Sequence, residues 1–437
     1  MSGPGFIIAA HKSGAGKTTL TLALLAALRR RGLVVHAAKA GPDYIDPAFH
    51  ERATGHGSVN LDSWSMPPGL LDALMRETAT DADFVVVEGV MGLFDGIAGP
   101  PGRTGAAADL ASRFGLPVIL VIDVTSQAQS AAALLRGFAT HDPAVQIAGV
   151  VLNRVASDRH AKLVSRAIKA LRIPILGQLP RNSTVSLPER HLGLVQAGEH
   201  DDLDHRFAAL ADMAEAHLDL DAILALARPA QIAGEAVSGR LPPPGNRIAV
   251  AQDRAFTFLY PHLARAWREQ GATLVPFSPL ADEGPDPTSD ACWLPGGYPE
   301  LHAGTLAYAT NFKAKLASFA QSRPVHGECG GYMVLGEGLV DGDGTRHAMA
   351  GLLSHATSFA DRKLHLGYRQ AELLEPSVLG DVGTTLRGHE FHYAQVIESG
   401  HDAPLASLAD GEGQPMGSAG GRRGTVTGSF FHAIAAA

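Results

Sequence analysis

The run HKSGAGKTT, residues 11–19, contains the residue types that bind the phosphates of a nucleotide. Such a loop needs small residues whose backbone N–H groups can face phosphate oxygens, a lysine for the terminal phosphates and a hydroxyl group for Mg²⁺. Gly14 and Gly16 meet the first need, Lys17 the second and Thr18 the third. The order of apolar run, loop, lysine, threonine and helical pattern predicts an ATP site rather than a glycine-rich turn that only starts a helix.

The loop departs from the common pattern G-x-x-x-x-G-K-[ST] and carries an additional cation. His11 stands where the pattern has its first glycine, and Lys12 supplies a second lysine. Asn153, in LNR at the end of another apolar run, presents an amide donor and acceptor that suit an adenine edge, although a turn amide fits the same position. We predict the following ATP-binding residues: Lys12, Gly14, Gly16, Lys17, Thr18, Thr19 and Asn153.

Acidic side chains follow two further apolar runs. Asp43 and Asp46 lie in GPDYIDP, Glu88 ends FVVVEG, and Asp95 lies in EGVMGLFDG. Open α/β sheets bind their ligands at the carboxyl ends of the strands, and these acids exceed what one Mg²⁺ needs. Each acid alone fits a turn or a helix cap equally well. Jointly they predict a Mg²⁺ site made of Thr18, Asp43 and Glu88. We expect Asp46 and Asp95 to face the acceptor substrate.

A second group of reactive residues surrounds Cys329, one of two cysteines in the chain. The run PVHGECGGYMVLG, residues 324–336, predicts a strand, a tight turn and a helix, which is the pattern of a nucleophile elbow. A free thiol has a pKa of ~8.5, so a cysteine nucleophile needs a base and an exposed position. We predict that Cys329 is an exposed nucleophile. The N–H groups of Gly330 and Gly297 are the predicted oxyanion donors.

The base must be a histidine, and the chain has 20 of them. His432, in VTGSFFHAI, follows a strand-like run and is the best candidate by position, whereas His389 and His392 in RGHEFHY are competitors. A lone histidine beside an apolar run is more often structural than catalytic. Cys292, in ACWLP, fits a buried strand position and receives no chemical role.

Two series of strands must position these residues. Continuous apolar runs bounded by turn residues predict strands at residues 5–10, 33–40, 84–89, 117–124 and 147–155. Runs without strict alternation are typical of a parallel sheet covered on both faces. The intervening helical patterns, such as residues 17–32, predict a doubly wound α/β domain.

A triple proline interrupts this pattern and marks a domain boundary. The stretch AVSGRLPPPGNR is followed by strand-like runs at residues 247–253, 273–279, 291–297 and 324–331. We predict an ATP- and substrate-binding domain at 1–235, a linker at 236–246 and a second doubly wound α/β domain at 247–437. Residues 182–235 have a mainly helical pattern that does not indicate which domain they join.

The composition limits the class of protein. A chain of 437 residues with 46% hydrophobic and 18% charged residues is typical of a globular protein with two domains. A net charge of −8 disfavours a nucleic-acid partner, and two cysteines cannot form a disulfide framework, which fits a reducing cytosol. The sequence has neither a signal-peptide pattern nor an uncharged apolar run of 18 residues. We expect a cytoplasmic protein without a membrane partner.

These motifs resemble known families. The loop with Lys12 resembles the deviant phosphate loop of dethiobiotin synthetase and the septum-site ATPases. PGGYPELH, ECGGYMVLG and GSFFHAI resemble the class I, or triad, glutamine amidotransferase domain. That family has a glutamate two residues beyond the histidine, where this chain has Ile434. The resemblance therefore implies a dyad of Cys329 and His432, as in the cobyrinic and hydrogenobyrinic acid a,c-diamide synthases and cobyric acid synthase.

Both halves together resemble the a,c-diamide synthases over nearly the whole chain, through KAGPDYIDPAFH, EGVMGLFDG, PGGYPELHA and LRGHEFHYA. Cobyric acid synthase is similar in layout, but we expect it to be longer and to lack the complete loop that Lys17 marks here. The resemblance implies amidation of corrinoid carboxylates a and c, with ATP and glutamine as co-substrates, Mg²⁺ as cofactor and an acyl phosphate intermediate. Arg387 and His389 are candidates for binding the corrinoid.

Other functions remain open from the sequence. One is a nucleotide-switch ATPase, similar to the partition proteins, with an inert C-terminal domain. A second is an amidoligase of the cobyric acid synthase type, and a third is a dethiobiotin synthetase with a fused domain. A homodimer is one assembly that we consider. The motifs do not distinguish a corrinoid with cobalt from one without it.

Overall fold

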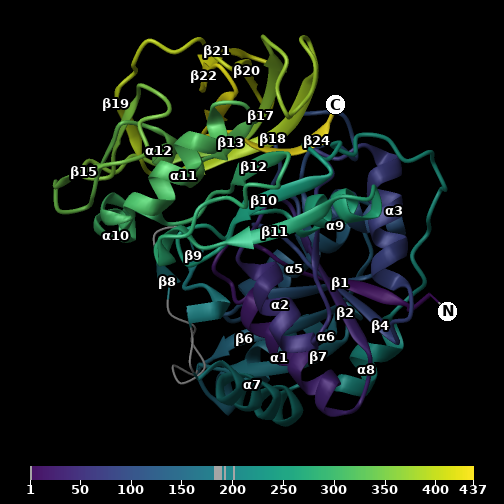
Figure 1. Cartoon of the computed structure of the whole chain (residues 1–437). Helices are drawn as coiled ribbons and strands as arrows, with labels where there is room; N and C mark the ends of the chain where they lie inside the picture. The colour runs from purple at the N-terminus through teal and green to yellow at the C-terminus, as the bar shows by residue number, and fades with distance from the viewer. Residues whose placement is uncertain (1, 182–188, 191–192, 200–201) are drawn as a thin grey trace. The chain divides into compact units, whose positions relative to one another are not determined.

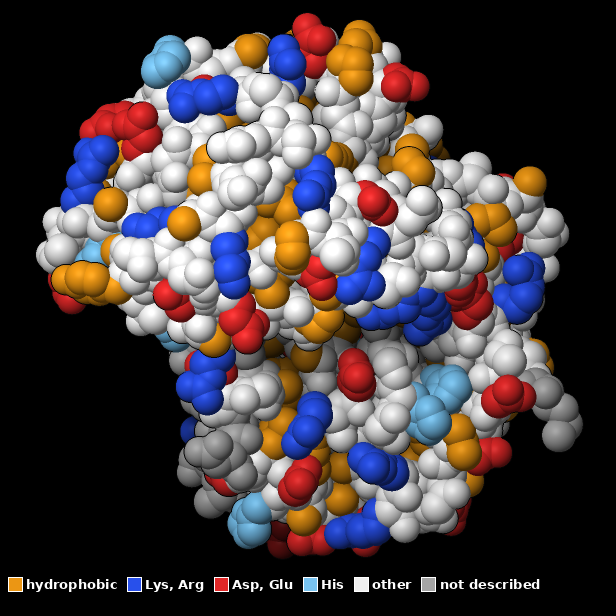
Figure 2. All heavy atoms as spheres, in the orientation of Figure 1, with side chains coloured by type: hydrophobic (Ala, Val, Ile, Leu, Met, Phe, Trp, Pro, Cys, Tyr) orange, Lys and Arg blue, Asp and Glu red, His pale blue; other side chains and the backbone are white. Residues whose placement is uncertain are grey.

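The computed structural model describes residues 2–181, 189–190, 193–199 and 202–437 (Figure 1). The chain forms two compact units, Met1–Val237 and Ser238–Ala437. Figure 2 shows Lys and Arg side chains interspersed with Asp and Glu side chains on the face drawn. Within the described ranges, no helix combines the length and the apolar character that crossing a bilayer requires.

The first unit contains a parallel sheet of seven strands in the order β3-β2-β4-β1-β5-β6-β7. Its strands are β1 (Gly5–Ala10), β2 (Val35–Ala40), β3 (Val59–Leu61), β4 (Phe84–Glu88), β5 (Val118–Asp123), β6 (Ile147–Val155) and β7 (Ile175–Pro180). The five predicted strands are confirmed as β1, β2, β4, β5 and β6. The strands β3 and β7 were not predicted, because VNL is short and ILGQLP mixes apolar and polar residues.

Helices alternate with these strands, as the doubly wound prediction requires. They are α1 (Lys17–Arg30), α2 (Asp46–Thr54), α3 (Pro68–Ala79), α4 (Ala107–Phe114), α5 (Ser130–His141) and α6 (Asp158–Lys169). The first of them ends where Arg29 and Arg30 occupy the last turn, a position at which cations interact favourably with the helix dipole. It contacts β1, β2 and β4 and so joins the phosphate loop to the centre of the sheet.

The end of this unit is partly helical. It contains the short strands β8 (Glu189–Arg190) and β9 (Gly193–Leu194), a 3₁₀ turn η1 (Ala197–Glu199), α7 (Leu203–His217) and α8 (Leu220–Leu226). Helix α7 packs on α1, where Arg30 forms ion pairs with Asp212 and Glu215. This segment therefore belongs to the first unit. The helical prediction for 182–235 holds for α7 and α8 but not for β8, β9 or 227–235. Residues 182–188, 191–192 and 200–201 lie outside the described residues.

The second unit contains a six-stranded sheet in the order β11-β10-β12-β13-β23-β22, in which only the β22 pairing is antiparallel. Its strands are β10 (Arg247–Ala251), β11 (Thr273–Phe277), β12 (Ala291–Leu294), β13 (Val325–Glu328), β22 (Gly421–Arg423) and β23 (Val426–Ser429). The accompanying helices and 3₁₀ turns are α9 (Pro261–Glu269), η2 (Pro279–Ala281), η3 (Pro299–Leu301), α10 (Ala303–Tyr308), α11 (Thr310–Ala320) and α12 (Gly330–Leu335). This α/β pattern confirms the fold class predicted for the second half.

Antiparallel strands after α12 were not predicted from the sequence. One sheet comprises β17 (His365–Leu373), β18 (Thr385–His392), β20 (Ala406–Asp410), β21 (Pro415–Ala419) and β24 (His432–Ala436). A smaller, mixed sheet comprises β14 (Gly338–Val340), β15 (Arg346–Ala348), β16 (Ala356–Ser358) and β19 (Gln395–Glu398), and in it β14 and β16 pair in parallel. The first of these sheets matters for chemistry, because β24 carries His432 and pairs with β18.

Gly331 in α12 is packed so closely against β12 that it has no room for a side chain. An ideal β-carbon at this position would lie 1.9 Å from the carbonyl oxygen of Leu294, a backbone atom that cannot rotate away. We predict that Gly331→Ala lowers the free energy of unfolding of the second unit by about 2–3 kcal/mol, the upper part of the range for overpacking. Chemical denaturation, followed by the fluorescence of Trp267 and Trp293 in a Trp64→Phe background, measures the loss.

Gly304→Ala in α10 is the matched control. The nearest atom to its new β-carbon would be a side-chain atom of His347 at 3.8 Å, which is ordinary contact. Equal unfolding midpoints for the two variants would contradict the close approach of α12 and β12.

Candidate active sites

The phosphate loop occupies residues 11–16, between the end of β1 and the start of α1. Gly14 and Gly16 have φ angles of 70° and 100°, which a residue with a β-carbon adopts only with strain. An ideal β-carbon on Gly16 would also lie 2.1 Å from the side-chain nitrogen of Asn153. The loop therefore has the backbone conformation, free of side chains at Gly14 and Gly16, that we predicted from its glycines.

Asn153 supports this loop from the end of β6. Its side-chain nitrogen donates to the carbonyl oxygen of Ala15 at 2.8 Å, and its side-chain oxygen accepts from the N–H of Arg154 at 2.8 Å. An amide group has two N–H hydrogens and two lone pairs, so each atom retains capacity for one more hydrogen bond. Recognition of adenine by Asn153 stays a prediction.

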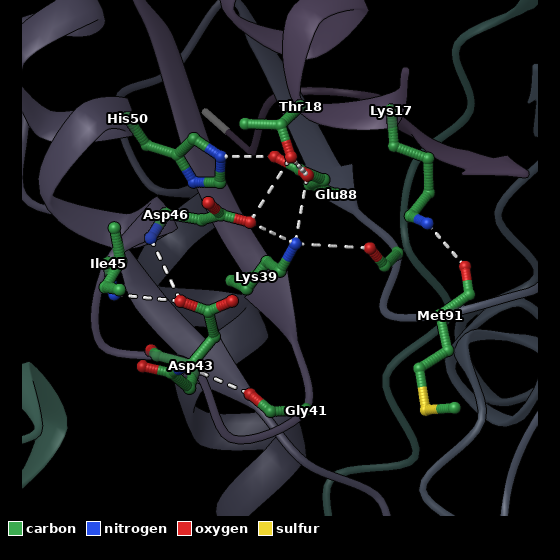
Figure 3. A network of polar contacts seen from close by, with 12 residues as sticks. Lys17, Thr18, Lys39, Gly41, Asp43, Ile45, Asp46, His50, Glu88 and Met91 are labelled. Carbon is green, nitrogen blue, oxygen red and sulfur yellow. Dashed lines mark hydrogen bonds and ion pairs between the residues drawn. The ribbon is translucent and has the colours of Figure 1, made fainter. Parts of the chain in front are cut away.

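The side chain of Lys17 is positioned by a hydrogen bond to the backbone of the first unit. Its ammonium group donates to the carbonyl oxygen of Met91 (Figure 3). Burial, together with the charge of Lys39, lowers the pKa of Lys17 to about 8. An approaching phosphate would raise this pKa again, since an anion favours the charged ammonium. Lys12 is exposed and Thr19 is half-buried beside this loop, and their contacts with ATP stay predictions.

A buried network brings three of the predicted residues together around Lys39 (Figure 3). The Nζ atom of Lys39 lies 2.5 Å from Asp46 Oδ2 and 2.9 Å from Glu88 Oε1. Thr18 donates its hydroxyl hydrogen to Glu88 Oε1 at 2.6 Å. His50 Nε2 lies 2.8 Å from the other oxygen of Glu88. One ammonium group is therefore shared between two carboxylates, and Thr18, in the first turn of α1, joins them to the helix that follows the phosphate loop.

The two carboxylates of this network differ in their acidity. Burial raises the pKa of Glu88, but the charge of Lys39 and the hydrogen bonds from His50 and Thr18 outweigh it, so this pKa lies below its ordinary value. For Asp46, burial and the nearby charge of Asp43 raise the pKa well above its ordinary value. The directions of the two shifts make Asp46 the weaker acid of the pair.

The remaining predicted acids shape the loops around the network. Asp43 Oδ1 accepts hydrogen bonds from the N–H groups of Ile45 and Asp46, at 2.8 and 3.0 Å, and so fixes the start of α2. Asp95 Oδ2 accepts from the N–H of Gly92 at 2.9 Å. These contacts are the turn and helix-cap roles that the sequence allowed as alternatives to ligand binding. Metal binding by Asp43 and substrate binding by Asp95 stay predictions.

The oxygen donors here fit Mg²⁺ in type. Hydroxyl and carboxylate oxygens, with phosphate oxygens, are the ligands that Mg²⁺ prefers, and Thr18 and Glu88 supply the first two. Across the ranges that the structure describes, no group of three or more His, Cys, Asp or Glu side chains forms a metal cage. A Mg²⁺ ion bound through nucleotide phosphates does not require such a cage.

Sequence reasoning missed Lys39 and His50. Lys39 carried a signal, because it is a charged residue near the carboxyl end of LVVHAAKA, a run predicted as a buried strand. A buried lysine needs a carboxylate partner, and strand ends are where ligands bind. His50 carried no signal beyond its place in the motif KAGPDYIDPAFH.

The second site is built on a strained turn at Cys329. β13 ends at Glu328, α12 begins at Gly330, and Cys329 between them has φ 48° and ψ −104°. Its N–H donates to the carbonyl oxygen of Ser429 at 2.7 Å. The predicted order of strand, tight turn and helix is present. Non-glycine residues hold such angles only where the surrounding structure enforces them, and they are frequent at functional sites.

The prediction that Cys329 is exposed was wrong. The residue is 3% exposed and packs in an apolar cluster with Tyr332 and Met333 of α12. Burial, aided by the charge of Glu300, raises the pKa of the Cys329 thiol above its ordinary value. The hydrogen bond with the Gly330 backbone acts in the opposite direction but does not compensate. The raised pKa favours the neutral thiol, so the predicted role of Cys329 as nucleophile would require a base to remove its proton.

The loop at residues 295–298 lies beside both the elbow and His432. An ideal β-carbon on Gly330 would lie 3.0 Å from the backbone nitrogen of Gly297. An ideal β-carbon on Gly296 would lie 2.6 Å from Cε1 of His432. The structure thus collects the predicted nucleophile turn, oxyanion donors and base in one place, although their roles stay predictions.

The competing histidines lie on β18. His389 is 2% exposed and stacks on His432 with ring centroids 5.1 Å apart, and its pKa is well below its ordinary value, first because of burial and then because of the charge of His432. His392 stacks on Phe430 at 3.8 Å, and burial lowers its pKa to about 3. Burial does not favour the predicted contact of His389 with a corrinoid. Arg387, also on β18, is half-buried.

Comparisons with known proteins match both units. The family model for the CobQ/CobB/MinD/ParA nucleotide binding domain matches residues 6–195, and that for the CobB/CobQ-like glutamine amidotransferase domain matches residues 247–437. The chain is 60% identical, over 100% of both chains, to a protein of Mesorhizobium japonicum named hydrogenobyrinate a,c-diamide synthase. Proteins with this name from Agrobacterium fabrum and Rhodobacter capsulatus are each 56% identical, over 100% and 99% of this chain and 99% and 98% of theirs.

The Lys39 network gives a prediction for stability. Lys39→Met leaves two buried carboxylates without their cation, so we expect the free energy of unfolding near neutral pH to fall by about 3–5 kcal/mol. The pKa values of Asp46 and Glu88 then rise in the folded protein, which binds more protons than the unfolded chain. The deficit should therefore shrink as the pH falls from about 8 to about 5. Chemical denaturation of the variant and of wild type at several pH values between about 8 and about 5 measures this difference in the free energy of unfolding.

Two companion variants make this test specific. Lys12→Met removes an exposed lysine and should change stability little. The double variant Lys39→Met with Asp46→Asn should recover part of the loss, because it removes one of the two unpaired charges. Equal stability of Lys39→Met and wild type at every pH would contradict the ion pairs.

Proposed function

Because the chain belongs to the hydrogenobyrinate a,c-diamide synthase family, we propose that it amidates the a and c side-chain carboxylates of hydrogenobyrinic acid, with ATP and glutamine as co-substrates. The observation that carries this proposal is the 60% identity to a relative of that name over the whole length of both chains. The presence of a nucleotide-binding unit and an amidotransferase unit in one chain supports it. The reaction belongs to cobalamin biosynthesis.

The first unit has to make a carboxylate reactive. Ammonia does not displace the oxygen of a free carboxylate at a useful rate, so the substrate carboxylate attacks the γ-phosphorus of ATP, the bond from that phosphorus to the bridging oxygen breaks, and ADP leaves. Ammonia then attacks the carbonyl carbon of the acyl phosphate, phosphate leaves, and loss of a proton from nitrogen gives the amide. Lys17 would offset the charge of the γ-phosphate, and the open backbone of the loop would offer N–H donors. Mg²⁺, held by Thr18 and Glu88 with the phosphates, would supply further neutralisation of charge. Asp46 would face the acceptor.

The second unit has to release ammonia from glutamine. His432 removes the thiol proton as the sulfur of Cys329 attacks the side-chain amide carbon. The N–H groups of Gly297 and Gly330 receive the developing oxyanion. The imidazolium then protonates the departing nitrogen, ammonia leaves, and water hydrolyses the glutamyl thioester. The raised pKa of Cys329 is consistent with a thiol that loses its proton only during this attack.

Further parts of the proposal rest on chemistry alone. We infer a cytoplasmic location, where ATP and glutamine are available. The homodimer stays a prediction, as does the binding of the corrinoid by Asp95, Arg387 and His389. The relatives are named for hydrogenobyrinate, so the proposed ring lacks cobalt. A nucleotide-switch ATPase does not account for the strained turn at Cys329 or for the amidotransferase match.

The division of labour between the two units is tested by Cys329→Ala. We expect this variant to lose amidation with glutamine as nitrogen source, because no thioester can form. Amidation with an ammonium salt should stay within about twofold of wild type, since the acyl phosphate chemistry does not use the sulfur. Mass spectrometry of the corrinoid product measures both. Loss with both nitrogen sources, in a variant that unfolds like wild type, would contradict the proposal.

The acceptor is tested by counting amides. Wild-type enzyme with hydrogenobyrinic acid, ATP, Mg²⁺ and glutamine should give a product in which two carboxylates have become amides, and the reaction should stop there. The cobalt-containing ring and an already diamidated corrinoid serve as competing substrates. Addition of further amides to the diamidated ring would favour the cobyric acid synthase alternative instead.

A further inference from the structure

The acid that normally orients the histidine of a triad amidotransferase is missing from its usual place. Ile434, two residues beyond His432, occupies that position in the sequence, and its side chain is 1% exposed on β24. An imidazole that acts as a base must present one nitrogen to the nucleophile, and a group on the other nitrogen fixes which tautomer is present. The structure therefore has to orient His432 in another way.

A carboxylate from a different element lies at the far nitrogen of His432. Glu328, the last residue of β13, is 1% exposed, and its Oε2 atom lies 3.5 Å from His432 Nδ1. Its other oxygen, Oε1, accepts a hydrogen bond from the N–H of Ala433 at 3.0 Å. One carboxylate oxygen thus accepts a hydrogen bond from the backbone next to His432, and the other oxygen faces the imidazole.

The opposite edge of the same imidazole faces the predicted oxyanion loop. An ideal β-carbon on Gly296 would lie 2.6 Å from Cε1 and 3.3 Å from Nε2 of His432. Nδ1 is thus the nitrogen beside Glu328, and Nε2 is the nitrogen on the side of Gly296 and its neighbour Gly297. One face of the ring stacks on His389, whose Nδ1 lies 3.1 Å from the hydroxyl of Tyr260.

We propose that Glu328 is the positioning carboxylate for His432 and replaces the acid that Ile434 displaced. The proposal rests on the proposed function, because it assigns His432 as the base. In the reaction, Nε2 takes the thiol proton as the bond between sulfur and the amide carbon forms. The hydrogen on Nδ1 stays directed at Glu328, whose negative charge stabilises the imidazolium. The proton then moves from Nε2 to the departing nitrogen.

The distance of 3.5 Å between the carboxylate and Nδ1 is long for a hydrogen bond. Catalytic hydrogen bonds are often long without substrate and tighten when it binds. The hydrogen bond from the Ala433 N–H holds the Glu328 carboxylate close to His432, so only a small movement is needed to shorten its distance to Nδ1. Because Glu328 and Cys329 are consecutive, one backbone turn positions both the nucleophile and the orienting acid.

A purely structural role for Glu328 makes a different prediction from a positioning role. If the side chain only braces β24, Glu328→Gln is harmless, because the amide oxygen can accept the Ala433 N–H in the same way. If it positions His432, the same variant is damaging. Its oxygen is held by Ala433, so its NH₂ group faces Nδ1. Nδ1 must then accept a hydrogen bond, Nε2 carries the hydrogen, and the ring cannot act as a base.

The experiment compares glutamine hydrolysis by full-length Glu328→Gln, Glu328→Asp and wild type. We expect Glu328→Gln to lower kcat by about 10²-fold, the lower end of what general acid–base catalysis contributes, with KM within about twofold of wild type. Glu328→Asp keeps the charge and should give a kcat between the other two. Thermal unfolding should be nearly the same for Glu328→Gln and wild type.

Asp402→Asn is the matched control. Asp402 is also a buried carboxylate that accepts a backbone N–H, from Ser354, and it pairs with Arg423. We expect its kcat for glutamine hydrolysis to stay within about twofold of wild type. A kcat for Glu328→Gln equal to that of wild type would overturn the proposal, as would an equal loss in Glu328→Gln and Asp402→Asn.

Amidation with an ammonium salt separates this inference from the proposed function. If wild type and Glu328→Gln both amidate the corrinoid with ammonium, and only the variant fails with glutamine, the inference stands. If wild type amidates with neither nitrogen source, the proposed function fails. If both enzymes use glutamine equally well, the proposed function survives and the role of Glu328 is overturned.

Discussion

Both candidate sites are organised around a carboxylate that ends a parallel strand and is shut off from water. Glu88 is the last residue of β4 and Glu328 is the last residue of β13, and they are 0% and 1% exposed. Removing a carboxylate from water costs several kcal/mol unless charges or hydrogen bonds compensate it. Each acid therefore needs its charged or hydrogen-bonding partners to stay buried, and loss of a partner would destabilise the fold. The partners include Lys39 and His432, which are also groups that can bind or transfer protons.

The two acids are compensated in different ways, and the difference matches the proposed tasks. Glu88 meets the permanent cation of Lys39, a hydroxyl and an imidazole, so its charge is neutralised before any substrate arrives. Glu328 meets a backbone N–H and the imidazole of His432. In the proposed mechanism, a full counter-charge for Glu328 appears when His432 becomes an imidazolium. An interaction that strengthens as the reaction proceeds lowers the barrier, whereas one that is equally strong throughout does not.

The local parts of both sites and several residues at the strand ends were predictable from the sequence, whereas Lys39 and the contact of Glu328 with the backbone beside His432 were not. The glycines of the phosphate loop and of the elbow act within a few residues, so their patterns were sufficient. Lys39 and Glu88 are 49 residues apart and meet because β2 and β4 pair in register. Glu328 and Ala433 are 105 residues apart and meet across β13, β23 and the start of β24. The antiparallel strands had no distinctive pattern, so neither the stacking of His389 nor the burial of Cys329 could be foreseen.

The burial of Cys329 constrains the mechanism more than the presence of the elbow does. A thiolate formed in advance would be unstable here, because burial raises the pKa and the neighbouring charges of Glu300 and Glu328 raise it further. In the proposed mechanism, the thiol therefore loses its proton to a base that is already oriented at the moment of attack. Glutamine brings an amide oxygen whose developing charge the loop N–H groups can stabilise, so substrate binding makes the transfer favourable. Without substrate the sulfur stays protonated, and a protonated, buried sulfur reacts slowly with oxidants and other electrophiles. If Cys329 is the nucleophile, the negative charge beside it, which at first sight opposes catalysis, would restrict its reactivity to the occasions when glutamine is bound.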